Sequence, residues 1–254
     1  MGLMKNSVIQ KLFDINDQFY QEFGRSFAAT RRRVQPGILR ILKEWIKDGD
    51  WLDLGCGSGA LGGVWVENGI NGLYEGLDFS PVLIAEARAT TGLLDLKENQ
   101  KILYTQTNFE EEDWVKNCSL TRYDGVLMFA ALHHLPGEAT RTRLLNQIAG
   151  LLEPESLFIH SEWQFQRSEK LMARVQPWQT IGLENDELEP GDTLLDWRYA
   201  QPDQEAKTGL RYVHLFDREE LQKLAEMTGF KIINEFDSDG ASGDLSLYQI
   251  WQKS

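Results

Sequence analysis

Short apolar runs alternate with helical apolar spacings across the middle of the chain. The short runs predict β-strands, and the longer segments with apolar residues three and four positions apart predict helices. The predicted strands are residues 51–54, 73–77, 102–106, 123–129 and 157–160, and the predicted helices are residues 58–69, 81–89 and 138–152. This regular alternation indicates a parallel sheet that is covered by helices on both faces.

Helices and a hairpin are predicted on either side of this core. Apolar residues between positions 7 and 23 recur at helical spacing, and a second helix should begin near Pro36, because proline suits a first helical turn. After the core, a helix at 218–228 precedes two strands at 231–235 and 245–251. A turn rich in Asp, Ser and Gly joins these strands, so we expect an antiparallel hairpin that closes the sheet.

Residues 163–210 interrupt the alternation. The segment contains Trp163, Trp178 and Trp197 and many acidic residues, but no clean periodicity. Such a segment is typical of a lid or a binding insertion, and it is too aromatic for a disordered linker. We therefore expect a single domain made of an N-terminal helical cap, a core, a lid, and a C-terminal helix with its hairpin. The four parts are residues 1–48, 49–162, 163–210 and 211–254 of the domain 1–254.

The composition argues against two kinds of partner, nucleic acid and membrane. Hydrophobic residues make up 42% and charged residues 26%, as in a soluble globular protein. The net charge of −13 disfavours broad electrostatic capture of nucleic acid, although the basic run Arg31-Arg32-Arg33 leaves room for a local patch. No apolar run approaches the length that spans a bilayer, so we expect no membrane partner.

The cysteines and histidines do not suggest a metal centre. Cys56 and Cys118 are too few for a disulfide framework, so we expect both to be reduced and buried, in a cytoplasmic protein without a secretory signal. His133 and His134 are the only adjacent pair of candidate ligands, and neighbouring side chains of a regular element point apart. We therefore expect no metal site.

The segment Asp53-x-Gly55-x-Gly57-x-Gly59 carries the strongest functional signal. It directly follows a predicted strand, and Asp78 ends the next predicted strand. Glycines let the backbone turn sharply and let a ligand approach closely, and an acid at the end of the second strand can accept hydrogen bonds from a ribose diol. The arrangement predicts a nucleoside site; an ordinary strand-to-helix turn without a ligand is the alternative.

This motif resembles the first motif of the class I S-adenosylmethionine (SAM) methyltransferases, which reads acid-x-Gly-x-Gly-x-Gly. The resemblance implies an α/β fold, namely a Rossmann-like seven-stranded sheet with helices on both faces, an antiparallel C-terminal hairpin and a lid after the fifth strand. It implies SAM as cofactor and S-adenosylhomocysteine (SAH) as product. Asp78 would hold the ribose, and Asn108, which is equally typical of a turn, would meet the adenine edge. The expected cofactor-binding residues are Arg31, Asp53, Gly55, Cys56, Gly57, Gly59, Asp78, Phe79, Asn108, Phe109 and Phe129.

The segment Phe129–Pro136 contains Leu132-His133-His134-Leu135 and follows the fourth predicted strand. In open α/β sheets ligands bind beyond the carboxyl ends of the strands, so this segment should lie where acceptor and cofactor meet. It is similar to a Leu-His-His-Leu signature in one branch of the methyltransferase family. A histidine there could act as a general base toward a phenol or an amine, whereas a lone histidine is more often structural.

Two further segments resemble the methyltransferases that esterify carboxymethyluridine at the tRNA wobble position. They are Phe23–Arg31 near the N-terminus and Leu210–Phe216 near the C-terminus. The resemblance implies Arg211, Tyr212 and His214 as further catalytic candidates, with Arg211 or Arg31 orienting a carboxylate that is already ionised at neutral pH. An acidic chain could bind tRNA through a local patch or with a small activating protein partner. A surface pair flanking a strand is the alternative for Arg211 and Tyr212.

Two other functions stay open at this point. A small-molecule O- or N-methyltransferase would use residues 163–210 as an aromatic lid with Trp163, Trp178 and Trp197 around the acceptor. A non-catalytic SAM-binding subunit would keep the glycine loop and Asp78 without chemistry. A closed aromatic cavity favours the small-molecule acceptor, and an open cleft edged by arginines favours RNA.

Overall fold

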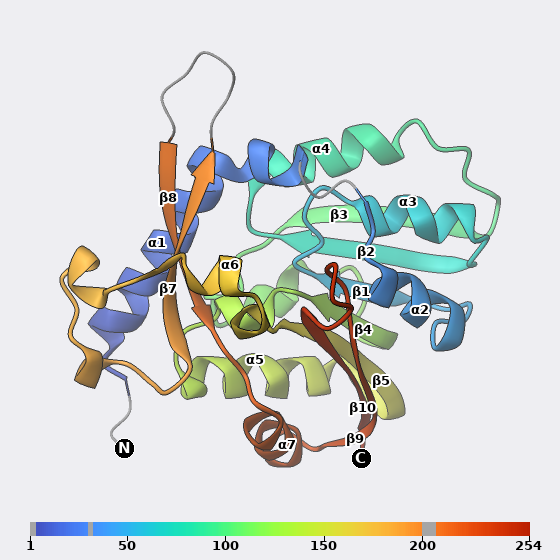
Figure 1. The fold of residues 1–254 in the computed structure, drawn as a ribbon. Helices are drawn as coiled ribbons and strands as arrows, with labels where there is room; N and C mark the ends of the chain where they lie inside the picture. Colours follow the sequence, from blue (N-terminus) through green and yellow to red (C-terminus); the bar gives the residue numbers. More distant parts are fainter. Residues whose placement is uncertain (1–3, 30–32, 200–206) are drawn as a thin grey trace.

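The structure is a computed structural model that describes residues 4–29, 33–199 and 207–254. Its centre is a seven-stranded sheet with the strand order β3-β2-β1-β4-β5-β10-β9 (Figure 1). The five strands from β3 to β5 run parallel, and β10 runs antiparallel to both β5 and β9. The strands are β1 (Trp51–Leu54), β2 (Gly72–Asp78), β3 (Gln100–Gln106), β4 (Tyr123–Phe129), β5 (Leu152–Trp163), β9 (Phe230–Ser238) and β10 (Ser246–Lys253). The predicted parallel core and the predicted closing hairpin are both confirmed.

Helices cover both faces of this sheet (Figure 1). One face packs against α2, α3 and α4 through a buried cluster that includes Ile41, Trp65 and Ile84. The other face packs against α5 and α7 through a cluster that includes Leu145 and Leu224. The helices are α2 (Pro36–Glu44), α3 (Ala60–Glu67), α4 (Pro81–Thr91), α5 (Glu138–Gly150) and α7 (Arg218–Met227), with the short 3-10 helices η1 (Trp114–Asn117) and η2 (Leu132–His134) in the connecting loops. Each apolar stripe buries one side of its helix, which is why the spacing predicted these helices.

The long strand β5 begins earlier than its apolar run suggested. The sequence predicted a strand only at 157–160. In the structure β5 starts at Leu152, and its register with β4 shifts between Tyr123 and Gly125. Glu155 has a φ of 71°, in the left-handed region. This residue therefore lies at an irregularity within one strand and does not separate two elements.

The described residues of the predicted lid include strands of a second sheet. Strands β6 (Val175–Gln176), β7 (Asp192–Tyr199) and β8 (Lys207–His214) form a three-stranded antiparallel sheet. The proposed boundary between residues 210 and 211 therefore divides a strand, and the unit that covers the core extends to His214. The remaining elements of this segment are η3 (Phe165–Arg167), α6 (Glu169–Met172), η4 (Trp178–Ile181) and η5 (Asn185–Glu187).

The N-terminal helix α1 (Asn6–Ala29) packs against this second sheet. Trp197 of β7 meets the rings of Phe19 and Phe23 edge-on, with ring centroids 5.7 and 5.3 Å apart. Leu12 and Tyr212 belong to a further buried cluster between α1 and the sheet. Helix α1 and the second sheet together form what we call the cover, which lies over the carboxyl ends of the core strands (Figure 1). Within the described residues, no helix has both the length and the apolar character that a bilayer crossing requires.

Candidate active site

A cavity of about 530 Å³ lies between the core strands and the cover. It sits beside β1 and β4, the neighbouring strands at which the strand order reverses, and this is where open α/β sheets bind their ligands. Its volume is within the range of small-molecule sites. The expected site residues that line it are Asp53, Gly55, Cys56, Gly57, Asp78, Phe79, Asn108, Phe109, Phe129, His133, His134 and Arg211.

The glycine loop needs its glycines for two different reasons. Gly55 and Gly57 have φ values of 78° and 56°, a left-handed conformation that side chains disfavour. A Cβ at Gly55 would lie 2.7 Å from the Cβ of Ala131, so this glycine allows close packing. A Cβ at Gly57 would meet no described heavy atom within 4 Å, and Gly57 lines the cavity. The backbone at Gly57 thus leaves open space into which a ligand fits.

Cys56 lines the cavity, whereas Gly59 does not. Gly59 is the N-cap of α3, and its Cα faces Tyr104 and Ala87, so the structure places it outside the cavity lining. Its expected role as a cofactor contact becomes a role in packing α3 onto the sheet. Cys56 lines the cavity and is half-buried, less than the sequence suggested, and its thiol is free. Burial raises the pKa of the Cys56 thiol, which therefore stays protonated at neutral pH.

The two predicted acids lie side by side beneath the cavity. Asp78 accepts backbone hydrogen bonds from Gly57 and Ser80, both at 2.9 Å. Burial raises the pKa of Asp78 to about 6, against the lowering effect of these two bonds. Burial likewise raises the pKa of Asp53 to about 7, although the Tyr74 hydroxyl donates a hydrogen bond to it. Both carboxylates are thus held in fixed positions in a site of low polarity, where a positively charged ligand would favour their ionised form.

His133 and His134 lie together in η2, at the wall of the cavity. Their ring centroids are 4.5 Å apart, so the expectation that adjacent rings point apart is wrong. A 3-10 helix has three residues per turn, which sets neighbouring side chains closer than the opposite faces of a strand. The Nδ1 atom of His133 lies 3.1 Å from Glu162, whereas His134 has Tyr20 and the Tyr212 carbonyl as partners at 3.2 and 3.1 Å.

Asn108 and Phe109 follow β3 as expected. The side chain of Asn108 lines the cavity and also accepts a hydrogen bond from the Glu110 backbone at 3.0 Å, so it is a turn residue as well. Phe109 is buried and packs edge-on against Trp114, with ring centroids 5.5 Å apart. Burial and the nearby Asp17 raise the pKa of Glu110 to about 7. This end of the cavity therefore combines an aromatic wall with acidic groups.

Strand β8 places the side chain of Arg211 on one side of the second sheet and those of Tyr212 and His214 on the other. Arg211 lines the cavity, is 5% exposed, and lies 4.8 Å above the ring of Trp163. Tyr212 and His214 point the other way, because side chains alternate along a strand. Both are buried and both contact Asp192 at 2.7 Å. The structure does not bring Tyr212 and His214 into the cavity, which corrects the expectation that they contact an acceptor.

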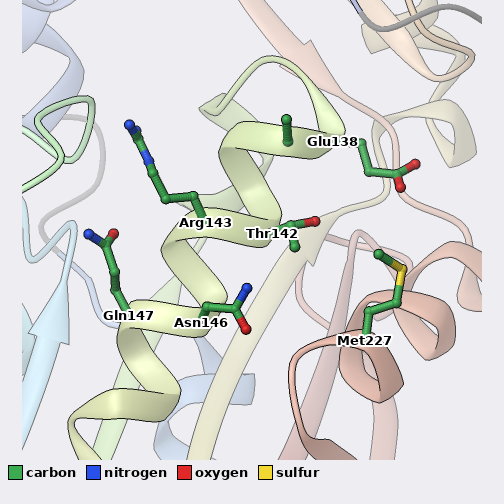
Figure 2. Close-up of a pocket in the computed structure, with 7 residues that line it drawn as sticks. Glu138, Thr142, Arg143, Asn146, Gln147 and Met227 are labelled. Atoms are coloured by element: carbon green, nitrogen blue, oxygen red, sulfur yellow. The ribbon is translucent and has the colours of Figure 1, made fainter.

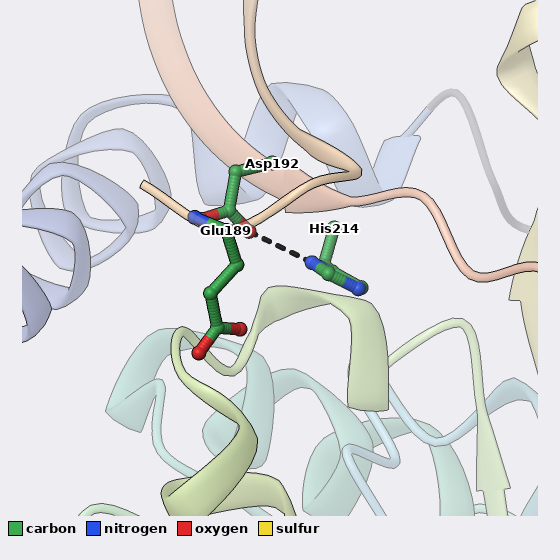
Figure 3. A group of neighbouring side chains, drawn as sticks. All are labelled: Glu189, Asp192 and His214. Atoms are coloured by element: carbon green, nitrogen blue, oxygen red, sulfur yellow. Dashed lines mark hydrogen bonds and ion pairs between the residues drawn. The ribbon is translucent and has the colours of Figure 1, made fainter. Parts of the chain in front are cut away.

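Instead, His214 belongs to a buried network of charged side chains. Glu189, Asp192 and His214 could each offer one ligand atom to a metal ion, and Figure 3 shows His214 against Asp192. However, Arg141 of α5 lies 2.7 Å from Glu189, and it balances the negative charge of the cluster. Burial lowers the pKa of His214, but its hydrogen bonds to Asp192 and Glu220 outweigh that effect and raise the pKa overall. We therefore regard this network as the attachment of the cover to the core.

A second hollow, of about 670 Å³, lies on the outer surface between α5 and α7. Figure 2 shows Arg143 directed away from Met227 across this hollow. The residues around it are Glu138, Ala139, Thr142, Arg143, Asn146, Gln147 and Met227. None of the residues predicted for the site lies there, so it is not the candidate active site.

The sequence missed the contribution of α1 to the cavity. Phe13, Asn16, Asp17 and Tyr20 all line it, and their spacing of three and four residues places them on one face of the helix. The signal was present, since Asn16 and Tyr20 carry polar groups within an otherwise apolar stripe. Asn16 is only 5% exposed and donates a hydrogen bond to the His134 carbonyl at 3.2 Å. A buried polar residue at a helical core position is a useful indication of a site.

The basic run is described only in part. Arg31, which the sequence nominated as a cofactor contact, lies outside the described residues, as does Arg32. Arg33 is exposed and lines the cavity. Of the three tryptophans expected in the lid, Trp163 lines the cavity, whereas Trp178 packs against α1 and Trp197 against Phe19 and Phe23.

Comparison with known proteins identifies the family. The sequence profile of a methyltransferase domain matches residues 25–235. A candidate methyltransferase of Encephalitozoon cuniculi (strain GB-M1) is 26% identical over 238 residues, 93% of this chain and 94% of that protein. A SAM-dependent methyltransferase of Methanosarcina mazei has a similar fold, with a TM-score of 0.60, 20% identity, and coverage of 87% of this chain and 98% of that one.

A glycopeptide N-methyltransferase, MtfA, solved in complex with SAM, also shares the fold, with a TM-score of 0.60, 16% identity and 86% of each chain covered. The glycine loop, the acid that ends β2 and the sheet order occur together with a domain match over most of the chain. The chain therefore belongs to the methyltransferase domain family, and it is a SAM-dependent methyltransferase.

Proposed function

We propose that this enzyme methylates a small-molecule acceptor that enters the cavity beneath the cover. The observation that carries the proposal is that the cover partly encloses the site. Helix α1 and strand β8 cover the carboxyl ends of the core strands, and the basic residue Arg211 in the wall is only 5% exposed. An RNA-binding surface relies on accessible Lys and Arg side chains, whereas a small acceptor fits a largely preformed and mainly apolar cavity.

SAM fits the residues beneath this cavity. The open space at Gly57 would receive its methionine portion, Asp78 would accept hydrogen bonds from the ribose hydroxyls, and Asn108 would meet the adenine edge. When bound, SAM supplies an electrophilic methyl group on a positively charged sulfur. Asp53 and Asp78 place negative charge nearby, so they would favour the cation and become more fully ionised. The residues of the cover would exclude water and orient the acceptor.

Two proteins of similar fold have acceptors of this kind. MtfA is a glycopeptide N-methyltransferase, and CalS10 of Micromonospora echinaspora is an amino pentose methyltransferase with a TM-score of 0.57 to this chain. At 16% and 18% identity they share the fold alone. They support the proposal by showing that this architecture accommodates acceptors other than nucleic acid.

Methylation of a carboxylate on a modified tRNA wobble uridine is the second candidate. Arg211 favours it, because a planar guanidinium in the cavity wall can orient a carboxylate with two hydrogen bonds. Arg33 adds an exposed cation at the cavity. Against it, Asp17, Glu110 and Asp239 also line the cavity, and the chain carries a net charge of −13. Acidic groups of this kind repel the phosphates of an RNA.

A labelling experiment separates the two candidates. Purified enzyme is incubated with methyl-labelled SAM and either the small-molecule fraction or the tRNA of a cell lysate, with and without the lysate proteins that could supply an activating partner. We expect label in the small-molecule fraction and none in tRNA. Label that appears in tRNA, with or without the added proteins, would overturn the proposal in favour of the second candidate. The variant Asp78→Ala serves as the inactive control.

A further inference from the structure

We infer that Tyr20 and His134 form a proton relay in the cavity wall, which makes Tyr20 a catalytic residue and selects an acceptor whose nucleophile carries a proton. The inference rests on the proposed function, since it names the class of acceptor for the same site. It joins residues from two distant parts of the chain, α1 and η2, and both line the cavity.

The hydrogen bonds of His134 fix its tautomer. Its Nδ1 atom lies 3.1 Å from the backbone carbonyl oxygen of Tyr212. A carbonyl oxygen can only accept a hydrogen bond, so Nδ1 must carry the hydrogen. In a neutral imidazole the other nitrogen then holds a lone pair. The Nε2 atom of His134 is therefore the basic atom, and it lies 3.2 Å from the Tyr20 hydroxyl, which donates to it.

The position of Tyr20 suits a group that contacts the acceptor. Tyr20 is half-buried, and its ring meets the rings of Phe79 and His134 edge-on, at centroid distances of 5.4 and 5.9 Å. Phe79 directly follows Asp78, the acid at the expected ribose position. The ring of Tyr20 thus packs against the residue next to the expected ribose position, while its hydroxyl contacts the basic nitrogen of His134.

Asn16 holds the three elements of the relay in place. Its side-chain nitrogen donates to the His134 carbonyl at 3.2 Å, and its side-chain oxygen accepts from the Tyr212 backbone at 2.8 Å. Asn16 lies one helical turn before Tyr20 on α1. The same residue therefore fixes η2, β8 and α1 relative to one another, so that the hydrogen bond from Tyr20 to His134 is preorganised.

His133 has the opposite arrangement of ring nitrogens, with Nδ1 as the acceptor. Its Nδ1 atom accepts a hydrogen bond from the Trp163 backbone at 3.4 Å and lies 3.1 Å from Glu162. Burial raises the pKa of the Glu162 carboxyl well above its usual range. Because Nδ1 accepts from the Trp163 N–H, the Nε2 atom of neutral His133 carries the hydrogen and is a donor. Of these two adjacent histidines, His134 is the one arranged to take up a proton.

The proton balance of the transfer follows from this arrangement. A lone pair of the acceptor oxygen or nitrogen forms the bond to the methyl carbon, and the electron pair of the broken carbon–sulfur bond stays on sulfur. The acceptor's proton passes to the Tyr20 hydroxyl oxygen while the Tyr20 proton passes to Nε2 of His134. The products are the methylated acceptor, a neutral thioether and a protonated His134, which later releases its proton to water.

This relay distinguishes classes of acceptor. A hydroxyl or an amine must lose a proton as it is methylated, so it gains from the relay. A carboxylate is already ionised at neutral pH and has no proton to give. The structure of the cavity wall therefore favours O- or N-methylation of a proton-bearing group over ester formation.

The first test does not depend on the acceptor. Nitrogen-15 NMR of histidine-labelled enzyme in complex with SAH reports which nitrogen of His134 carries the hydrogen. We expect the Nδ1–H form in the wild type, and a clear shift of the Nε2 signal in Tyr20→Phe. An Nε2–H form, or an Nε2 signal that Tyr20→Phe leaves unchanged, would overturn the relay. Because this readout needs only SAH, it stands apart from any failure of the proposed small-molecule activity.

The second test follows the rate with pH, using the lysate small-molecule fraction as acceptor. In Tyr20→Phe and His134→Gln we expect at least about a 100-fold loss near neutral pH, with activity rising steadily toward alkaline pH as the acceptor ionises by itself. The control Tyr123→Phe removes a hydroxyl that binds Glu75 away from the cavity, and it should keep the wild-type profile. SAH affinity should stay within about threefold in both relay variants. A loss of activity that is the same at every pH would show that Tyr20 has only a structural role. So would a methyl ester, formed from a carboxylate acceptor, that Tyr20→Phe makes as fast as the wild type.

Discussion

Asp78 accepts a hydrogen bond from the backbone nitrogen of Gly57 at 2.9 Å. This bond ties the acid that ends β2 to the glycine loop that follows β1, so the two halves of the nucleoside site form one unit. The same carboxylate binds the backbone of Ser80, which is the N-cap of α4. A change at Asp78 should therefore affect both the loop and the ligand that rests on it.

SAH binding should weaken as the pH falls. The pKa of Asp78 is raised to about 6 and that of Asp53 to about 7, so both carboxylates are ionised above these values and become protonated below them. A protonated carboxyl loses charge and acceptor capacity toward the ribose and the ligand's amino group. We expect calorimetry to show constant affinity above about pH 8, a fall of up to about tenfold per pH unit between about pH 7 and 6, and a steeper fall below about pH 6. Affinity that is independent of pH across this range would contradict the assignment of these acids.

Gly57→Ala should reduce SAH affinity more than it reduces stability. Residue 57 has a φ of 56°, and alanine there costs about 1 kcal/mol in conformational energy. Its methyl group would also project into the open space that we assign to the methionine portion. The control Gly63→Ala lies within α3, where a Cβ meets no described heavy atom, and it should leave binding unchanged while adding about 0.5 kcal/mol of stability. Equal affinities in the two variants would place the ligand elsewhere.

Arg141→Met should loosen the cover. Arg141 is 1% exposed and lies 2.7 Å from Glu189 and 3.3 Å from Glu220, so its removal takes this buried cation away from two half-buried carboxylates. We expect the free energy of unfolding in urea to fall by about 3–5 kcal/mol. The control Arg122→Met breaks an exposed pair with Glu153 and should cost at most about 1 kcal/mol. A similar, small change in both variants would show that the network does not hold the cover.

The parallel core was predictable because its central strands, β1, β2 and β4, are largely buried. The runs around Leu52, Leu77 and Val126 are apolar and short, and the structure places them in neighbouring strands of one sheet. The acid and glycines of the loop were predictable because they follow a strand directly, where local sequence determines local geometry.

The second sheet was not predictable from periodicity. Strands β7 and β8 bury polar residues, among them Asp192, Asp196, Arg211 and His214, which erases the alternation that marks a half-buried strand. Several of these side chains have partners in other elements, as His214 has Asp192 and Asp196 has Arg174. The contribution of α1 to the cavity was not predicted either, since Tyr20 contacts His134 only in the folded chain.

Calorimetric titration of SAH into wild-type enzyme and Asp78→Ala tests the central assignment of the cavity most directly. Removing two charge-assisted hydrogen bonds to a ribose should cost about 3–5 kcal/mol, which is a loss of at least about 100-fold in affinity. The exposed variant Asp113→Ala, which breaks only a surface pair with Lys116, is the control and should bind as the wild type does. We expect saturable binding in the wild type and in the control, and no measurable binding in folded Asp78→Ala. Unchanged affinity in folded Asp78→Ala would contradict the account.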